Sequence, residues 1–149
     1  MQVSFNVQDK DVKAMLLKLQ SKTGNLKPAL RDIGIYMKKE VMDNFAAEGR
    51  PNRWHPLSKK YAARKAASMG AGKPILEFHG KLKQSINVRT GTNKTEVNTG
   101  VKYGVYHQTG TRKMVARPFM PDRKNQNIPP FHTGGINYIK RIIQLYLTG

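Results

Sequence analysis

The residues that most often carry catalysis are few and scattered in this chain. Histidine occurs four times, at His55, His79, His107 and His132. None of the four has another histidine or an acid three or four residues further on. After residue 49 the acids are only Glu77, Glu96 and Asp122. This supply is too small to favour a paired-carboxylate mechanism or a carboxylate-rich metal site.

Sequence signatures of enzymes are also missing. The chain contains no cysteine and no nucleophile-elbow pattern G-x-S-x-G. The stretch GAGKP, residues 70–74, departs from a phosphate loop, because Ala67 stands where its first glycine belongs and Pro74 replaces its Ser/Thr. A Ser-His-Asp triad stays open, since triads are assembled in space. We therefore expect no enzyme, no catalytic residue, no metal and no cofactor.

The chemistry that the chain does supply is basic. Residues 49–65, GRPNRWHPLSKKYAARK, carry six Lys or Arg, no acid and the single tryptophan. We take as candidate polyanion- or partner-binding residues Arg53, Lys59, Lys60, Arg64 and Lys65. Basic residues around an aromatic ring are typical of single-strand binding, where bases stack on the ring. The alternative, which we favour, is that Trp54 is buried as a structural anchor together with Pro56 and Leu57.

The positive charge is concentrated in the second part of the chain. The 149 residues have a formal net charge of +18. Residues 1–49 hold eight bases and six acids, whereas residues 50–149 hold nineteen bases and three acids. Such an excess attracts DNA, RNA or an acidic protein surface. No apolar run is long enough to span a membrane, and no secretory signal is evident at the start, so we expect one cytosolic domain over residues 1–149.

Apolar residues at helical spacing predict four helices. The first covers about residues 11–22, with Asp9 or Asp11 as its cap and Gly24 at its end. A long helix follows over about 26–48, with the N-cap expected at Asn25, Pro28 in its first turn and Gly49 at the C′ position. A basic helix begins after Ser58, and the last helix covers about 136–147. The long helix must dock its apolar stripe on a sheet or on a partner chain.

Short strands are predicted between and before these helices. Alternating apolar residues predict a strand over 3–7, a hairpin over 86–101 and a strand over 114–120, with Pro118 at its edge or end. A short turn or helix closed by Gly110 precedes the third strand. Helices and antiparallel strands mix without a βαβ rhythm, which favours an α+β fold.

The order of several short motifs resembles one known family. The long helix ends in Phe45 and Gly49, and P-x-x-W-x-P-L follows at Pro51, Trp54, Pro56 and Leu57. Then come I-L-x-x-x-G-x-L-x-x-S-I at Ile75, Leu76, Gly80, Leu82, Ser85 and Ile86, Y-x-x-Y-H-Q-x-G at Tyr103, Tyr106, His107, Gln108 and Gly110, and A-R-P-F-M at residues 116–120. In this order the motifs resemble the phage virion morphogenesis family, the tail-completion proteins of Mu-like and P2-like tailed phages. The likeness covers about residues 25–145.

Two positions depart from the family pattern. His79 stands where a hydroxyl residue usually precedes the glycine, and Gly104 stands where an alanine commonly follows the tyrosine. Neither position has a known chemical role. The positive charge is also heavier than is usual for the family.

The resemblance implies a non-enzymatic virion assembly protein. Such a protein would be assembled in the host cytoplasm and act at the neck or tail end, in tail completion or head–tail joining. It would form a ring of subunits and contact other phage structural proteins. The implied fold is a small antiparallel sheet with the long helix packed across it and a C-terminal helix. The motif residues would then keep the fold: Trp54 as an anchor beside Pro56 and Leu57, Gly80 and Gly110 as turns, Leu82, Tyr103 and His107 as packing residues, and Arg117, Pro118 and Phe119 as a strand end that fixes the sheet edge. The alternative function is a small basic nucleic-acid-binding protein, and DNA contact stays open under both hypotheses.

Overall fold

The computed structural model describes residues 9–70, 72–77, 80–122 and 124–149. Within these residues the fold contains six helices and one antiparallel hairpin, which confirms the predicted α+β class. The elements are α1 (Lys10–Thr23), α2 (Lys27–Ala46), α3 (Lys59–Met69), α4 (Lys81–Gln84), β1 (Ile86–Thr90), β2 (Thr95–Thr99), α5 (Gly104–Thr109) and α6 (Thr133–Thr148). The strand expected over residues 3–7 lies outside the described residues.

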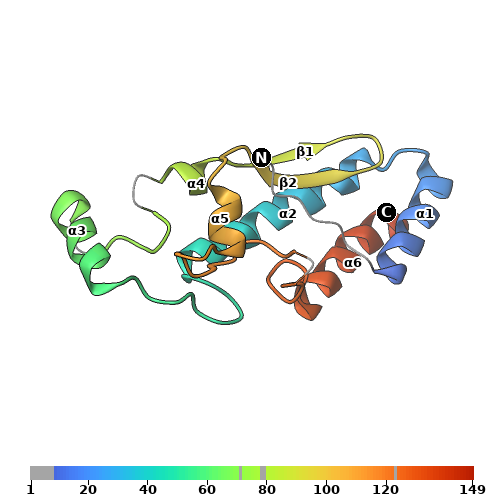
Figure 1. Ribbon diagram of the computed structural model, residues 1–149. Helices are drawn as coiled ribbons and strands as arrows, with labels where there is room; N and C mark the ends of the chain where they lie inside the picture. Colours follow the sequence, from blue (N-terminus) through green and yellow to red (C-terminus); the bar gives the residue numbers. More distant parts are fainter. Residues whose placement is uncertain (1–8, 71, 78–79, 123) are drawn as a thin grey trace.

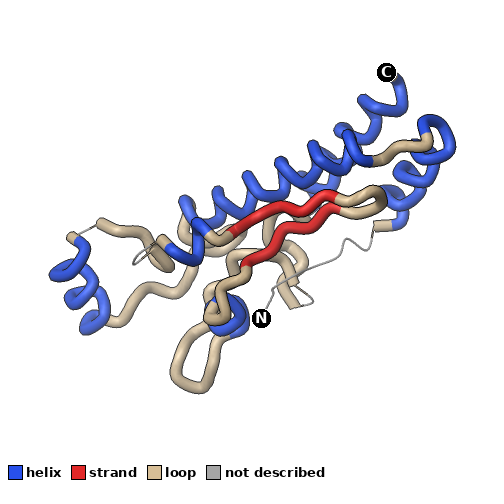
Figure 2. Tube along the Cα trace, turned by 90° about the horizontal axis from the view of Figure 1, so that it is seen from above, coloured by secondary structure: helices blue, strands red, loops and turns tan. Residues whose placement is uncertain are grey.

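Helix α2 is the central element of the fold. The hairpin packs on one side of α2 and α6 packs on another, while α1 contacts α6 (Figure 1). Seen from above, the two strands run side by side along the long helix (Figure 2). Helix α3 stands at the end of the molecule opposite α1 and α6. None of the described helices is both long and apolar enough to cross a membrane.

The helix ends show which sequence signals act. Asp9 caps α1 by accepting a hydrogen bond from the backbone N–H of Val12 at 2.9 Å, and Gly24 ends α1 with a φ of 69°. At the start of α2 the prediction was wrong by one residue. Leu26 occupies the N-cap without a side-chain bond, while the Asn25 side chain accepts from the N–H of Lys27 at 3.1 Å.

The end of α2 also lies one residue from the expected place. Glu48 occupies the position after the cap and has a left-handed φ of 54°, and Gly49, one residue later, has a positive φ of 105°. The Glu48 N–H donates to the carbonyl of Phe45 and the Gly49 N–H donates to that of Asn44, which is the Schellman arrangement. Gly49 is needed for space, because a Cβ there would lie 2.7 Å from the backbone nitrogen of Trp54. The chain therefore turns sharply enough to bring Trp54 back onto the end of α2.

An aromatic cluster fills the core where α2 ends. The Phe45 ring lies 5.7 Å from the Trp54 ring, edge to face, and 5.3 Å from the Phe119 ring. Phe45 and Phe119 are completely buried and Trp54 is nearly so. Burial of each such side chain contributes about 1.5–3 kcal/mol. This cluster joins three segments that are far apart in the sequence.

The predicted strand over 114–120 is wrong. Within this segment only Met114 makes a β-bridge, an isolated one to Thr111, and no ladder forms. The buried backbone of Phe119 and Met120 instead bonds to the side chain of Gln108, whose oxygen accepts from both N–H groups at 3.1 Å. Pro118, which has no N–H, is compatible with this arrangement. The expected role of residues 117–119 as a strand end is therefore replaced by bonding to side chains.

The hairpin packs against α2 through one face. Its register places Val88 opposite Val97 and Thr90 opposite Thr95. Across the interface lies Gly34 of α2, where an added Cβ would come within 2.6 Å of the Val88 side chain and 2.5 Å of the Thr95 hydroxyl. Gly34 thus allows the helix and the hairpin to approach closely.

Replacement of Gly34 by alanine tests this contact. Alanine gains about 1 kcal/mol of helix propensity over glycine, but overpacking against the stiff side chains of Val88 and Thr95 costs about 1–3 kcal/mol. We expect Gly34→Ala to lower the free energy of unfolding, measured by urea denaturation. Gly100→Ala is the control, since nothing lies within 4 Å of an added Cβ there. A Gly34→Ala protein more stable than the parent would contradict the close approach.

Candidate functional site

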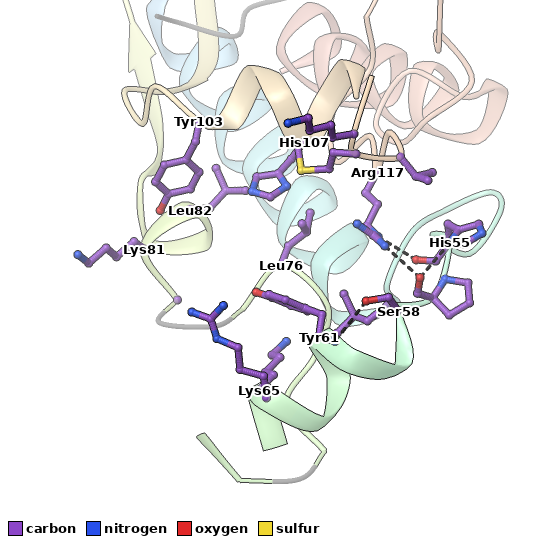
Figure 3. A pocket seen from close by; sticks show the side chains of 17 residues that line it. His55, Ser58, Tyr61, Lys65, Leu76, Lys81, Leu82, Tyr103, His107 and Arg117 are labelled. Carbon is purple, nitrogen blue, oxygen red and sulfur yellow. Dashed lines mark hydrogen bonds between the residues drawn. The ribbon is translucent and has the colours of Figure 1, made fainter. Parts of the chain in front are cut away.

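A cavity of about 790 Å³ lies beside α3 and is the candidate site. Residues 55–58 and α3 form one side, Leu76 and residues 80–82 another, and α5 with residues 113–117 the third (Figure 3). Its lining is His55, Pro56, Leu57, Ser58, Tyr61, Arg64, Lys65, Leu76, Gly80, Lys81, Leu82, Tyr103, His107, Lys113, Met114, Val115 and Arg117. None of these described lining residues is an acid.

Arg117 fixes one wall of the cavity to another. Its guanidinium is buried and donates to the carbonyl of His55 at 2.8 Å and to that of Pro56 at 3.0 Å. These bonds appear as dashed lines in Figure 3. One residue further on, the carbonyl of Pro118 accepts from the indole N–H of Trp54 at 2.7 Å. The segment before α3 is thereby bound to the segment after α5.

The start of α3 is defined by its cap. Ser58 accepts a hydrogen bond from the N–H of Tyr61 at 3.2 Å, as the sequence predicts. Two lysines, Lys59 and Lys60, are exposed in the first turn of this helix. The ring of Tyr61 points toward the cavity (Figure 3). Arg64 lies one turn after Lys60 and contributes to the lining, whereas Lys60 does not.

The five predicted basic residues are divided by the structure. Arg64 and Lys65 line the cavity, whereas Arg53, Lys59 and Lys60 are exposed and do not. Arg53 also lies 3.9 Å from the Glu48 carboxylate. The five residues therefore do not form one binding surface.

Lys65 is not an available surface cation. It is only 4% exposed, and its ammonium donates to the carbonyl of Pro74. Burial lowers its pKa, against the opposing influence of Glu48 and Glu77. Its amine therefore holds Pro74 against α3 and is turned inward, whereas the sequence led us to expect an exposed cation.

Many of the motif residues converge on the cavity. The lining includes Pro56, Leu57, Gly80, Leu82, Tyr103, His107 and Arg117. Trp54 and Phe119 do not line the cavity and are buried in the core, with Pro118 half-buried between Arg117 and Phe119. Gly110, with a φ of 75°, ends α5. Sequence reasoning missed Lys81, Lys113, Met114 and Val115, for which the only signals are charge and hydrophobicity. Their role depends on the folded geometry.

His107 is the titratable residue on the α5 side. Its ring lies 5.8 Å from that of Tyr103, edge to face, and its buried Nδ1 has no hydrogen-bond partner among the described residues. Burial lowers its pKa, and the positive charge of Arg117 lowers it further. Both influences favour the neutral form of the ring. Among the described residues, no group of three or more His, Asp or Glu is placed to hold a metal ion.

Comparisons with known proteins agree on one group. The model of the phage virion morphogenesis family matches residues 7–130, a range that contains every residue lining the cavity. The chain is also 29% identical over 122 residues to Mu-like prophage FluMu G protein 1 of Haemophilus influenzae, covering 79% of this chain and 77% of that protein. No solved structure matches the chain.

Removal of the Arg117 side chain tests its role as a tie. Arg117→Ala deletes two hydrogen bonds from a charged donor, and we expect the free energy of unfolding to fall by about 1–3 kcal/mol. Arg112→Ala, at an exposed position in the same loop, should change it by less than about 0.5 kcal/mol. Chemical denaturation of both variants measures the difference. Equal effects would show that the two bonds do not stabilise the fold.

His107 should make stability depend on pH. Because its pKa is lowered in the folded state, the unfolded chain binds this proton more readily, with a pKa of about 6.5. The contribution of neutral His107 to the free energy of unfolding is complete above that pH. It is lost as the pH falls below it. We expect His107→Gln to reduce the stability difference between about pH 7.5 and 5.5. His55→Gln, at an exposed position, is the control, and an unchanged pH dependence in His107→Gln would contradict the prediction.

Proposed function

Because the chain belongs to the phage virion morphogenesis family, we propose that it completes the tail or joins the tail to the head. In this proposal it is a non-enzymatic component of the virion, assembled in the host cytoplasm and placed at the neck or tail end. The observation that carries the proposal is the family match over residues 7–130, which includes α2, the hairpin and the whole lining of the cavity. The similar G protein of a Mu-like prophage supports the same class.

The proposed mechanism is assembly by complementary surfaces. Identical subunits with heterologous contacts form a ring when the rotation between neighbours closes. Helix α2 is largely covered by the hairpin and α6, but its Ile35 is 61% exposed. Leu17 on α1 and Leu145 on α6 are also exposed large apolar residues. These three helices are therefore candidates for contacts between subunits, in addition to the edges of the hairpin.

The charge distribution supports contact with a polyanion. Most of the basic side chains after residue 49 have no ion pair with a described residue. This excess can face an acidic protein at the junction or the DNA that passes through it. It also supports the second candidate function, a small nucleic-acid-binding protein. Such binding would weaken steeply with salt, because each neutralised phosphate releases counterions.

Deletion of the gene in the parent phage tests the proposed function. We expect filled heads and tails to accumulate separately, because the joint between them cannot be completed. Electron microscopy of the lysate and plaque counts measure the outcome. The intact gene supplied in trans should restore particles, and infectious particles of normal yield from the deletion would overturn the proposal.

A further inference from the structure

The cavity beside α3 combines an apolar wall with a basic rim. We propose that it binds an acidic segment of another virion protein, with an apolar side chain of that segment inserted between α3 and α5. This inference rests on the proposed function and names the partner chemistry of one site. The carboxylates of the segment would pair with Arg64, Lys81 and Lys113, while its apolar side chain would meet Leu76 and Val115.

The shape and lining fit a peptide. A volume of about 790 Å³ lies within the usual range for pockets that enclose a ligand. Leu76, Leu82 and the rings of Tyr61 and Tyr103 surround the space in Figure 3, and Lys81 extends outward from its rim. A pocket of this kind takes an anchoring side chain, and charges at its rim steer the partner and fix its register.

The basic residues at the rim have no internal partner that would satisfy their charge. Arg64, Lys81 and Lys113 are exposed and form no ion pair with a described residue. Glu77, the nearest acid in the sequence to Arg64 and Lys81, instead pairs with Lys83 at 3.1 Å. Since the described lining contains no acid, a ligand with carboxylates would find unpaired cations along this rim.

A second copy of this chain is a poor source of that charge. Each of its nine acids already has a partner within the chain. Asp9 and Asp11 lie near Lys140, Asp32 accepts from Tyr146, Glu40 pairs with Arg50, Asp43 with Lys39, Glu48 with Arg53, Glu77 with Lys83 and Glu96 with Lys94, and Asp122 accepts from Gln108 and Asn125. A neighbouring copy would have to share or exchange one of these contacts to offer a carboxylate, whereas an acidic segment of another protein need not. This difference favours a different protein as the occupant.

Nucleic acid fits the cavity less well. Binding to DNA or RNA draws on many phosphates along a groove that follows the backbone. This cavity is bounded, has three exposed cations and has aliphatic walls from Leu76, Leu82 and Val115 as well as rings. The aliphatic part has no use for a phosphate, whereas it suits the apolar side chain of a peptide.

Selection from a random peptide library tests the proposal. Peptides of about 12 residues would be selected on the immobilised full-length chain, resynthesised, and their dissociation constants measured by fluorescence anisotropy. We expect the enriched peptides to carry acids on both sides of an aromatic or aliphatic residue. The triple variant Arg64→Gln, Lys81→Gln, Lys113→Gln should bind these peptides at least about tenfold more weakly. Val115→Asn should also lower the affinity for the peptides, because it removes an apolar contact.

The matched control carries the same charge change elsewhere. Lys10→Gln, Lys13→Gln, Lys18→Gln alters three exposed residues of α1 and should change peptide affinity by less than about twofold. Circular dichroism would verify that each variant is folded. The proposal would be overturned if acidic peptides were not enriched, or if both triple variants weakened peptide binding equally. It would also be overturned if a single-stranded oligonucleotide bound more tightly and displaced the peptides.

The parent phage separates this inference from the function on which it rests. If the Arg64, Lys81, Lys113 variant fails to join heads and tails, as the deletion does, the inference is supported. If that variant assembles normally while the deletion does not, the inference is wrong and the proposed function stands. If the deletion itself gives normal particles, the proposed function fails.

Discussion

Side chains from three separate parts of the chain bond to the backbone of residues 118–120, and the walls of the cavity depend on these bonds. Gln108 of α5 accepts from two N–H groups of this segment, while Asn44 of α2 and Trp54 donate to its carbonyls. A buried backbone group without a partner costs about 1–3 kcal/mol. The segment can therefore lie in the core only because amide and indole groups replace the ladder of a strand. The same bonds fix α5 and the segment before α3 to the end of α2.

The sequence predicted the elements whose signals are local. The stripe of apolar residues placed α2, and alternation about a Thr/Gly/Asn turn placed the hairpin. Asp9, Gly24 and Ser58 act at helix ends as their chemistry predicts. At these helix ends the bonded partner lies within a few residues, so its position can be inferred without the fold. The single-residue shift at Gly49 shows the limit, because Glu48 accepts the left-handed conformation that glycine usually takes.

The errors arise where the partner is distant. Residues 114–120 have the composition of a strand, but a strand needs a neighbouring strand, and Gln108 satisfies this backbone instead. Lys65 belongs to a basic run that is expected to be exposed, yet its ammonium donates a hydrogen bond to the carbonyl of Pro74. The candidate site was predictable in its basic and aromatic character only. Its division into a wall and a rim requires Lys113 and Val115 to fold back toward α3, which no local pattern indicates.

The two signs of charge have different tasks in this fold. The acids cap helices, bond to loop residues or pair with neighbouring bases. Asp122, for example, accepts hydrogen bonds from Gln108 and Asn125. Partial burial alone would raise the pKa of Asp122, but its hydrogen bonds together hold that pKa below the usual value. Since the acids already have partners within the chain, most of the nineteen bases after residue 49, which outnumber the three acids there, have no acidic partner among the described residues. A chain with net charge of this size pays in self-repulsion. Contact with a partner of opposite charge would relieve that repulsion, so stability and assembly are coupled through the same unpaired side chains.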